Sequence, residues 1–326
     1  MQCLFTIENP ICRRHSSREY YSKEENKRKK KKKELLIVFD SHVDSIIETA
    51  ANTLIKQAYS INYLDDSDIS SNEWFQNNVD ARESAKTVTP LSFEKQIISH
   101  ENQCDFSTLT SYLTEEYILP ARSTFHLSDV KDLHLLEDKF DLILLDPPWR
   151  NKSVNRKKGY YTMYLDSLLD LPIKKLCNPG CLIIVWVTNK KKQISFVEKE
   201  LFQKWNVTSS VIWHWVKVTK KGHYVFPIDS QQKKPYENLL LGYVSSGEEK
   251  DKAHSKNLEA HKTIVSVPSS IHSHKPPLTE ILQPYLPENP RCLEIFARYL
   301  LPKWTSIGNE VIKLQNTKLF DRILVD

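Results

Sequence analysis

The sequence lacks several features that mark well-known classes of protein. Its six cysteines form no C-x-x-C pair, and its histidines and cysteines do not show the spacing of a zinc site. No apolar run approaches the roughly 20 residues that a spanning helix needs, and no secretory h-region is found near the N-terminus. We therefore expect an intracellular protein with reduced thiols, without a metal ion and without a membrane segment.

Glycine is also scarce, with six residues in a chain of 326. No G-x-G loop lies near Leu293–Arg298, so the pyrophosphate-binding loop of dinucleotide-binding proteins is missing there. Hydrophobic residues make up 40% of the chain, as in ordinary globular proteins, and the formal net charge is +5. This mild positive charge suits an anionic partner. The length suits one large domain, or a catalytic domain with an accessory region.

The first third of the chain differs from the rest in its charge and in the spacing of its apolar residues. Seven consecutive basic residues at Lys27–Lys33 predict a flexible basic tail over residues 1–34. This run is a solubilising segment, a nuclear-import signal or a phosphate-binding arm, and we expect a nuclear protein that could also occur in the cytoplasm. Apolar residues recur at helical spacing over residues 43–64. We expect an accessory, mostly helical region over residues 35–120.

Residues 121–326 alternate between strand-like and helix-like segments, which predicts an α/β domain with a mostly parallel sheet covered on both faces. Ligands of such sheets bind at the carboxyl ends of the strands. The predicted helices cover residues 165–176, 191–203 and 278–286. The predicted strands are DLILL, CLIIVWV, SSVIWHWVKVT, NLLLGYV, TIVSV, CLEIF and TSIGNEV.

The segment Asp146-Pro147-Pro148-Trp149 follows the buried strand DLILL. The two prolines end the strand and fix the direction of Asp146, because neither can continue the ladder of hydrogen bonds. Trp149 adds a flat face close to the carboxylate. Acceptors beside a stacking face suit a planar base with an exocyclic amino group. The alternative interpretation is a rigid turn with an aromatic cap.

Two further groups of residues have both a functional and a structural interpretation. The loop RNKSVNRKK, which begins at Arg150 and includes Lys152, carries five basic residues beside Asp146. It is predicted to contact phosphates next to the target nucleotide, and the alternative is a solvated loop. Trp213 and Trp215 alternate along a predicted strand, which favours core packing over a platform for a base.

Several separated motifs resemble the adenine-N6 methyltransferases related to the mRNA N6-adenosine methyltransferase, and within them the methyltransferase-like protein 4 branch. The resemblance extends from about Phe125 to Leu314. It implies a Rossmann-like fold with a permuted motif order, in which the D-P-P-W strand precedes the LEIFAR strand, and S-adenosylmethionine as cofactor. The motifs are DPPW, WHWVKVT, FPIDS, KKPYENLLLG, IHSHKPPL, LEIFAR and WTSIGNEV.

The resemblance also implies roles for individual residues. Asp146, Pro147, Pro148 and Trp149 form the catalytic motif. The acceptor would be bound by Trp149, Tyr160, Glu237, Arg150 and Lys152. The cofactor would be bound by Asp129, Val130, Asp146, Lys275, Phe296, Arg298, Asn309 and Glu310.

Four functions remain to be compared. The first is N6-adenine methylation of RNA, with a 2'-O-methylated adenosine of a small nuclear RNA as the substrate that the branch implies. The second is the same reaction on DNA, and the third is a non-catalytic nucleic-acid-binding subunit. The fourth, a protein glutamine methyltransferase with an N-P-P-Y loop, is disfavoured by Asp146 and Trp149. The presence of Asp146, Lys275, Arg298 and Asn309 argues against the third. A monomer and a complex with a partner subunit both fit the sequence.

Overall fold

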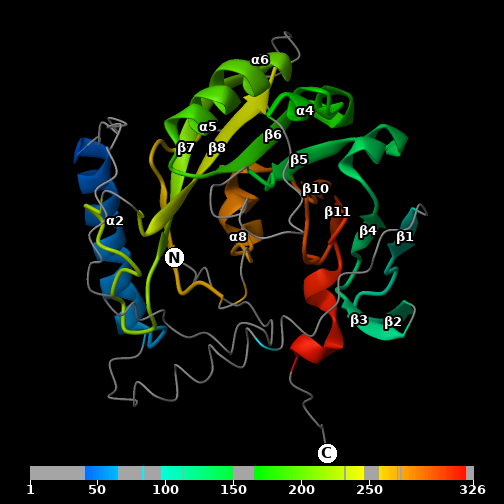
Figure 1. Ribbon diagram of the computed structural model, residues 1–326, viewed down its shortest axis with the longest axis horizontal. Helices are drawn as coiled ribbons and strands as arrows, with labels where there is room; N and C mark the ends of the chain where they lie inside the picture. The colour runs from blue at the N-terminus through cyan, green and yellow to red at the C-terminus, as the bar shows by residue number, and fades with distance from the viewer. Residues whose placement is uncertain are drawn as a thin grey trace, which may run out of the picture.

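A nine-stranded sheet forms the centre of the computed structural model, with helices packed on both of its faces (Figure 1). Across the sheet, the strands are β1 (Ile98–Glu101), β4 (Thr124–Leu127), β11 (Trp304–Gly308), β10 (Cys292–Ile295), β5 (Phe140–Leu145), β6 (Cys177–Val187), β8 (Tyr236–Val244), β7 (Val207–Lys217) and β9 (Thr263–Ser266). The structure describes residues 41–64, 83, 97–112, 114–149, 165–230, 233–245, 257–269, 271 and 274–320.

The directions of the strands divide the sheet into two parts. From β4 through β11, β10 and β5 to β6, every neighbouring pair is parallel. Beyond β6, strand β8 is antiparallel to both β6 and β7, and β9 is parallel to β7. The predicted, mostly parallel sheet is therefore confirmed. Because they share one direction, the strands β4, β5, β6, β7, β10 and β11 end at one edge of the sheet. Strand β8, which runs the opposite way, begins at this edge.

Strand β5 shows why the central strands read as continuous apolar runs. Leu142 and Leu144 face one core cluster, while Ile143 and Leu145 face the other, and all four are buried. A strand between two covered faces has no polar side. One cluster is covered by α4 (Leu165–Leu169), α5 (Lys191–Phe196), the π-helical turn η3 (Val197–Leu201) and α6 (Phe202–Lys204), and the other by α8 (Thr279–Leu282) and η4 (Gln283–Tyr285).

The helices predicted over residues 165–176, 191–203 and 278–286 are confirmed as series of short turns. The first consists of α4 and the 3-10 turn η2 (Ile173–Leu176), and the other two contain the helices named above. The remaining 3-10 turns are η1 (Val130–Leu135), η5 (Lys313–Gln315) and η6 (Thr317–Leu319).

The two tryptophans of the WHW segment belong to the core, as predicted. Trp213 is 0% exposed and Trp215 is 2% exposed. The indole Nε1 of Trp213 donates to the carbonyl oxygen of Glu259 at 2.8 Å, and that of Trp215 donates to Oγ of Ser266 at 2.8 Å. Both indoles are thus fully occupied by packing and hydrogen bonding, so neither is a platform for a base.

Helix α2 (Ser41–Ser60) confirms the helical pattern expected over residues 43–64. Its residues Ile47, Ala51 and Ile55 are spaced by four, lie on one face and pack in a cluster with residues of β7 and β9. Figure 1 shows α2 at one side of the molecule and β1–β3 at the opposite side. No helix among the described residues is long and apolar enough to cross a membrane.

The expectation of mostly helical structure over residues 35–120 is wrong for residues 98–119. They form β1, β2 (Thr108–Tyr112) and β3 (Glu115–Leu119), and β1 joins the main sheet beside β4. Three of the four residues of β1 are exposed, so this edge strand carries no apolar pattern. In β3 the pattern of period two is short, because only Tyr117 and Leu119 are buried.

Candidate active site

Most of the predicted site residues follow strands at the edge where the parallel strands end. Asp129 comes after β4, Asp146 after β5, Phe296 after β10 and Asn309 after β11. Glu237 lies at the beginning of β8, which runs in the opposite direction and therefore reaches the same edge. The topology thus brings together residues that are more than 100 positions apart in the sequence, as expected for a parallel sheet.

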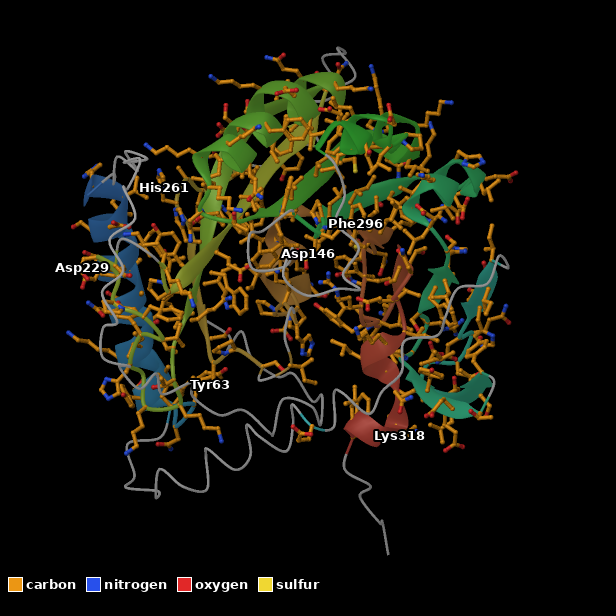
Figure 2. All side chains as sticks on the ribbon, in the orientation of Figure 1. Tyr63, Asp146, Asp229, His261, Phe296 and Lys318 are labelled. Carbon is orange, nitrogen blue, oxygen red and sulfur yellow. The ribbon has the colours of Figure 1, made fainter. Side chains whose placement is uncertain are left out.

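Asp146 is held in place through its backbone. Its N–H donates to the carbonyl oxygen of Ile295 in β10 at 3.3 Å, and its side chain is 8% exposed. Figure 2 shows Asp146 at the centre of the molecule, close to Phe296. The N–H of Trp149 donates to the carbonyl oxygen of Pro147 at 2.7 Å, which closes the turn after the strand. The carboxylate therefore has a fixed position at the end of β5.

The indole of Trp149 is fixed as well. Its Nε1 donates to the carbonyl oxygen of Trp186 in β6 at 2.7 Å, and the ring packs against the core cluster that contains β5 and β6. The side chain is partly exposed. A ring anchored at its nitrogen edge and packed on a core is a rigid flat surface next to Asp146, which is what stacking on a base requires.

A series of ion pairs runs through the site with alternating signs. Lys275 Nζ lies 3.3 Å from Asp146 Oδ1 and 3.2 Å from Glu237 Oε2. Arg298 contacts the other oxygen of Asp146 at 3.3 Å and Glu310 Oε2 at 3.3 Å. A lysine terminates the series at each end. We call this series the charge chain, and its members in order are Lys217, Glu237, Lys275, Asp146, Arg298, Glu310 and Lys313.

The neighbouring charges shift the pKa values of Glu237 and Lys275. Burial alone would raise the pKa of Glu237, but Lys275 and Lys217 outweigh it and lower that pKa to about 2. Burial disfavours the ammonium form of Lys275, but the carboxylates of Asp146 and Glu237 together raise its pKa above the ordinary value. The ammonium group also lies 5.3 Å from the centre of the Trp186 ring. Lys275 is therefore a fixed cation.

A further carboxyl group lies within the sheet close to the charge chain. Glu294 in β10 is 3% exposed, and its Oε2 has no hydrogen-bond partner among the described residues. Burial and then repulsion from Asp146 raise the pKa of Glu294 to about 8. Its neighbour across the strand pair is Ser306, whose buried hydroxyl likewise has no partner within the described part of the chain. Such groups are costly unless a further partner arrives.

Strands β10 and β11 approach closely where the LEIFAR segment leaves the sheet. Phe296 has a φ of 66°, a left-handed conformation that is strained for a residue with a side chain. The next residue, Ala297, donates its N–H to the carbonyl oxygen of Ile307 at 3.1 Å. A Cβ atom at Gly308 would lie 3.1 Å from the carbonyl oxygen of Ala297, so any larger residue there would push against the backbone of this turn. The turn directs Arg298 back towards Asp146.

Residues 140–310, which are more than half of the chain, match the sequence profile of the MT-A70 family. The chain belongs to the MT-A70 family. MT-A70 proteins are S-adenosylmethionine-dependent methyltransferases, and the mixed α/β sheet is consistent with a Rossmann-like fold. In this chain the D-P-P-W strand β5 precedes the LEIFAR strand β10, in the permuted order that the resemblance implied.

Three relatives place the chain within the MT-A70 family. It is 44% identical over 230 residues to the N(6)-adenine-specific methyltransferase METTL4 of Homo sapiens, which is 68% of this chain and 48% of that protein. It is 38% identical over 216 residues to a DNA N6-methyl methyltransferase of Caenorhabditis elegans (64% and 56%). It is 32% identical over 212 residues to the N6-methyladenosine RNA methyltransferase MTA1 of Pyricularia oryzae (61% and 55%).

The similarity to METTL4 confirms the predicted family and its branch. The chain spans about half the length of the relatives it matches. In this MT-A70 protein, the charge chain contains five of the residues that the resemblance assigned to the site, namely Glu237, Lys275, Asp146, Arg298 and Glu310.

The other residues that the resemblance assigned to the site lie outside the charge chain. Asp129 is the N-cap of η1, where its carboxylate accepts a hydrogen bond from the N–H of Lys131 at 3.0 Å. Val130 is 3% exposed and belongs to the core, so only its backbone could meet a cofactor. Asn309 is partly exposed at the end of β11. Three predicted substrate-binding residues, Arg150, Lys152 and Tyr160, lie outside the described residues.

Sequence reasoning missed Lys217, Lys313 and Glu294. The two lysines pair with Glu237 and Glu310, and nothing in the sequence distinguishes them from surface lysines. Glu294 was detectable in principle, because a charged residue inside the apolar strand CLEI is unusual. Among the described residues, no group of three or more histidines, cysteines and acidic residues could hold a metal ion.

Proposed function

We propose that this MT-A70 protein transfers a methyl group from S-adenosylmethionine to N6 of an adenine in a nucleic acid, most naturally RNA. The observation that carries the proposal is the placement of Asp146. Its carboxylate ends β5 between Lys275 and Arg298, and the rigid ring of Trp149 lies three residues further on. A carboxylate acceptor beside a stacking face matches a planar base that carries an amino group.

The residues at the edge of the sheet fit the cofactor. An amino-acid moiety has an ammonium and a carboxylate group, and Asp146 and Lys275 offer the two opposite charges 3.3 Å apart. Glu310 and Asn309 at the end of β11 would bind ribose hydroxyls, as the resemblance implies. Among the residues that the structure describes, Oε2 of Glu294 has no hydrogen-bond partner, as expected for a site whose polar contacts a ligand would complete. When bound, S-adenosylmethionine supplies an electrophilic methyl group.

The residues of the chain would then prepare the acceptor. Trp149 would stack on the adenine ring, and Asp146 together with the carbonyl oxygen of Pro147 would accept the hydrogens of the N6 amine. Those hydrogen bonds favour a more tetrahedral nitrogen, whose lone pair is no longer delocalised into the ring. In the transfer, N6 would bond to the methyl carbon as the bond from sulfur to that carbon breaks, with Asp146 and Pro147 holding the amine in place. The extra proton on N6 is released after transfer.

The choice of acceptor follows from the branch and not from a contact in the site. We favour RNA, with a 2'-O-methylated adenosine of a small nuclear RNA as the substrate that the METTL4 branch implies. DNA is the second candidate, because one relative is named a DNA N6-methyl methyltransferase. We further propose a nuclear location on the basis of Lys27–Lys33, which lies outside the described residues.

The test uses labelled S-adenosylmethionine and four matched oligonucleotides. Two are RNA, with adenosine or 2'-O-methyladenosine at one position, the third is the DNA equivalent, and the fourth is RNA with inosine, which lacks the amine. We expect transfer to the adenine-containing RNAs and none to inosine. Preference for DNA would replace RNA by the second candidate. Cofactor binding without transfer to any oligonucleotide would favour a non-catalytic subunit.

A further inference from the structure

Helix α2 lies outside residues 140–310, which the MT-A70 profile matches, yet it packs against the methyltransferase sheet. Its buried face shares a cluster with Val216 and Val218 at the end of β7 and with Tyr236 at the start of β8. These are the strand ends at the edge that carries Asp146. The helix is therefore part of the side of the molecule where an acceptor would approach.

The connection between β7 and β8, of which the structure describes residues 218–230 and 233–235, starts and ends at the charge chain. Lys217 is the last residue of β7, and Glu237 is the second residue of β8. The side chains of Lys217 and Glu237 form an ion pair. The segment folds back on itself, because Val225 N–H donates to the carbonyl oxygen of Lys217 at 3.1 Å and Val218 forms a bridge with Tyr224. We call it the β7–β8 loop. Its position at the carboxyl edge places it beside the proposed acceptor site.

Helix α2 holds the middle of the β7–β8 loop by hydrogen bonds and close packing. Tyr59 Oη donates to the carbonyl oxygen of Lys221 at 2.6 Å, and Tyr224 Oη donates to Oδ1 of Asn52 at 2.7 Å. Gly222 has a φ of 66°, and a Cβ atom there would lie 2.5 Å from Tyr59 Oη. Only glycine fits both the backbone conformation and the space.

The end of the β7–β8 loop is fixed by a single carboxylate of α2. Asp44 Oδ2 accepts from Lys234 Nζ at 2.6 Å, and its Oδ1 accepts from Tyr236 Oη at 2.8 Å. The side chains of Lys234 and Asp44 are only 9% and 16% exposed. Lys234 Nζ also donates to the carbonyl oxygen of Ile228 at 2.7 Å, which ties two parts of the loop together. Figure 2 shows Asp229, the residue after Ile228, on the side of the molecule where α2 lies.

Asp44 is connected to the active site through Tyr236. The carbonyl oxygen of Tyr236 accepts from Nδ2 of Asn189 at 2.7 Å, and Asn189 follows the end of β6. The residue after Tyr236 is Glu237, whose carboxylate pairs with Lys275, the partner of Asp146. A shift of Tyr236 would therefore move both the β6 end and one carboxylate of the charge chain.

From this geometry we infer that Asp44 of α2 is a positioning residue for acceptor binding, which fixes the β7–β8 loop and the start of β8 at the mouth of the site. The inference rests on the proposed function, since it assigns the loop to the nucleic-acid side. The loop is basic, with Lys220, Lys221 and Lys233 against one acid, Asp229, while Lys234 is paired with Asp44. A basic loop in a fixed position suits the phosphates of a polynucleotide.

The sign of the effect separates positioning from simple attraction. Asp44→Ala removes a negative charge, so long-range electrostatics alone would leave nucleic-acid binding unchanged or make it tighter. Positioning predicts the opposite, because Lys234 and Tyr236 lose their shared partner and the loop loses its fixed position. Glu48→Ala is the matched control. It removes the same charge one turn along α2, where the side chain is exposed.

The experiment measures, for the full-length wild type and both variants, oligonucleotide and S-adenosylmethionine affinities, KM for the oligonucleotide, kcat and Tm. For Asp44→Ala we expect a roughly tenfold weaker oligonucleotide affinity and a matching rise in KM, the order expected when charge-assisted hydrogen bonds are lost. Cofactor affinity and kcat should stay close to wild type. Asp44→Asn should be intermediate, because it keeps an acceptor for Tyr236. Glu48→Ala should behave as wild type.

Three results would overturn the inference. The first is an Asp44→Ala variant that binds the oligonucleotide as Glu48→Ala does. The second is an Asp44→Ala variant in which cofactor affinity and Tm fall together with oligonucleotide affinity, which would make Asp44 merely structural. Tyr59→Phe, which removes one hydrogen bond to the loop, then tests whether the position of the loop affects oligonucleotide affinity at a lower cost to the fold. The third is a wild type that binds no oligonucleotide, which would overturn the proposed function too. If the wild type is active and Asp44→Ala binds the oligonucleotide as tightly as the wild type, this inference is overturned while the proposed function stands.

Discussion

The two parts of the sheet bury polar side chains in different ways. In the antiparallel part, His214 Nδ1 bonds to Oδ1 of Asn238 at 2.7 Å, and Nδ2 of Asn238 donates to Oδ1 of Asn189 at 2.7 Å. The other ring nitrogen of His214 lies 3.0 Å from Nδ1 of His261. Because Asn238 uses its amide nitrogen elsewhere, its oxygen must accept, so Nδ1 of His214 carries the hydrogen. This set of hydrogen bonds is complete.

In the parallel part, the polar set is incomplete. Glu294 and Ser306 face each other across β10 and β11, and each has a buried atom without a partner among the described residues. Among the described residues, the two oxygens of Asp146 contact Lys275 and Arg298, each at 3.3 Å, which is long for charge-assisted hydrogen bonds. A complete buried set stabilises a fold, whereas an incomplete one at a strand edge is where polar groups of a ligand complete it. We therefore expect changes in the two parts to have different consequences.

The largest effect is expected at Lys275, which two carboxylates share. Lys275→Met leaves Asp146 and Glu237 close together without the cation between them, which should lower the free energy of unfolding by about 3 to 5 kcal/mol. Lys217→Met removes a cation at the more exposed end of the charge chain, and we expect about 1 kcal/mol or less. Denaturant unfolding of both variants measures the difference. Equal losses would show that position in the charge chain does not matter.

The next effect concerns Asp146 itself. Asp146→Asn keeps the shape of the side chain but removes the negative charge beside the acceptor amine. We expect the rate of methyl transfer to fall by at least about 100-fold, the magnitude for the loss of one electrostatic contact in a transition state. The variant should still fold, with a lowered Tm, because Lys275 and Arg298 each lose one carboxylate but keep Glu237 and Glu310. A variant that keeps full activity would remove Asp146 from the mechanism.

Glu294 should make stability depend on pH. Its folded pKa of about 8 lies above the ordinary 4.5, so its contribution to stability is complete below about pH 4.5 and is lost as the pH rises towards 8. Glu294→Gln should abolish this loss, which is on the order of a few kcal/mol. Unfolding of wild type and variant between pH 5 and 9 checks it. Parallel pH profiles for the two proteins would contradict the assignment.

Trp149 should affect one ligand more than the other. Trp149→Ala removes the stacking surface, and we expect a loss of about 1 to 3 kcal/mol in acceptor binding with a smaller change in cofactor affinity. Trp149→Phe keeps a ring but loses the hydrogen bond to Trp186, so it should be intermediate. Titrations of oligonucleotide and cofactor distinguish the two. Equal losses for both ligands would reject the stacking role.

The smallest effect on ligand binding is expected at His214. His214→Ala removes the contacts of His214 with Oδ1 of Asn238 and Nδ1 of His261, which should lower the free energy of unfolding by about 1 to 3 kcal/mol. Cofactor affinity should not change, because this set of hydrogen bonds is complete without a ligand. Calorimetric titration with S-adenosylmethionine is the measurement. A large loss of cofactor affinity would remove the distinction between the two parts of the sheet.

The sequence predicted central strands such as β5 and β8 because their residues are buried on both faces and therefore form continuous apolar runs. It did not predict β1–β3, which are short and exposed on one side or both. In the site, the D-P-P-W segment predicted Asp146 and Trp149, because a carboxylate and a flat ring fixed at the end of a buried strand suit a base that carries an amino group. Lys217 was not identifiable, because its partner Glu237 is brought beside it only by the pairing of β7 with β8. Lys313 pairs with Glu310 three residues earlier, a spacing that ordinary surface ion pairs share.

The central claim is that the carboxylate of Asp146, held at the end of β5, serves the methylation of an adenine amine. The most direct measurement digests a treated RNA oligonucleotide to nucleosides and identifies the methylated product by mass spectrometry. The account predicts N6-methylated adenosine, with or without a 2'-O-methyl group, from the wild type and none from Asp146→Asn. A methyl group on any other atom, or equal N6 methylation by the variant, would contradict it.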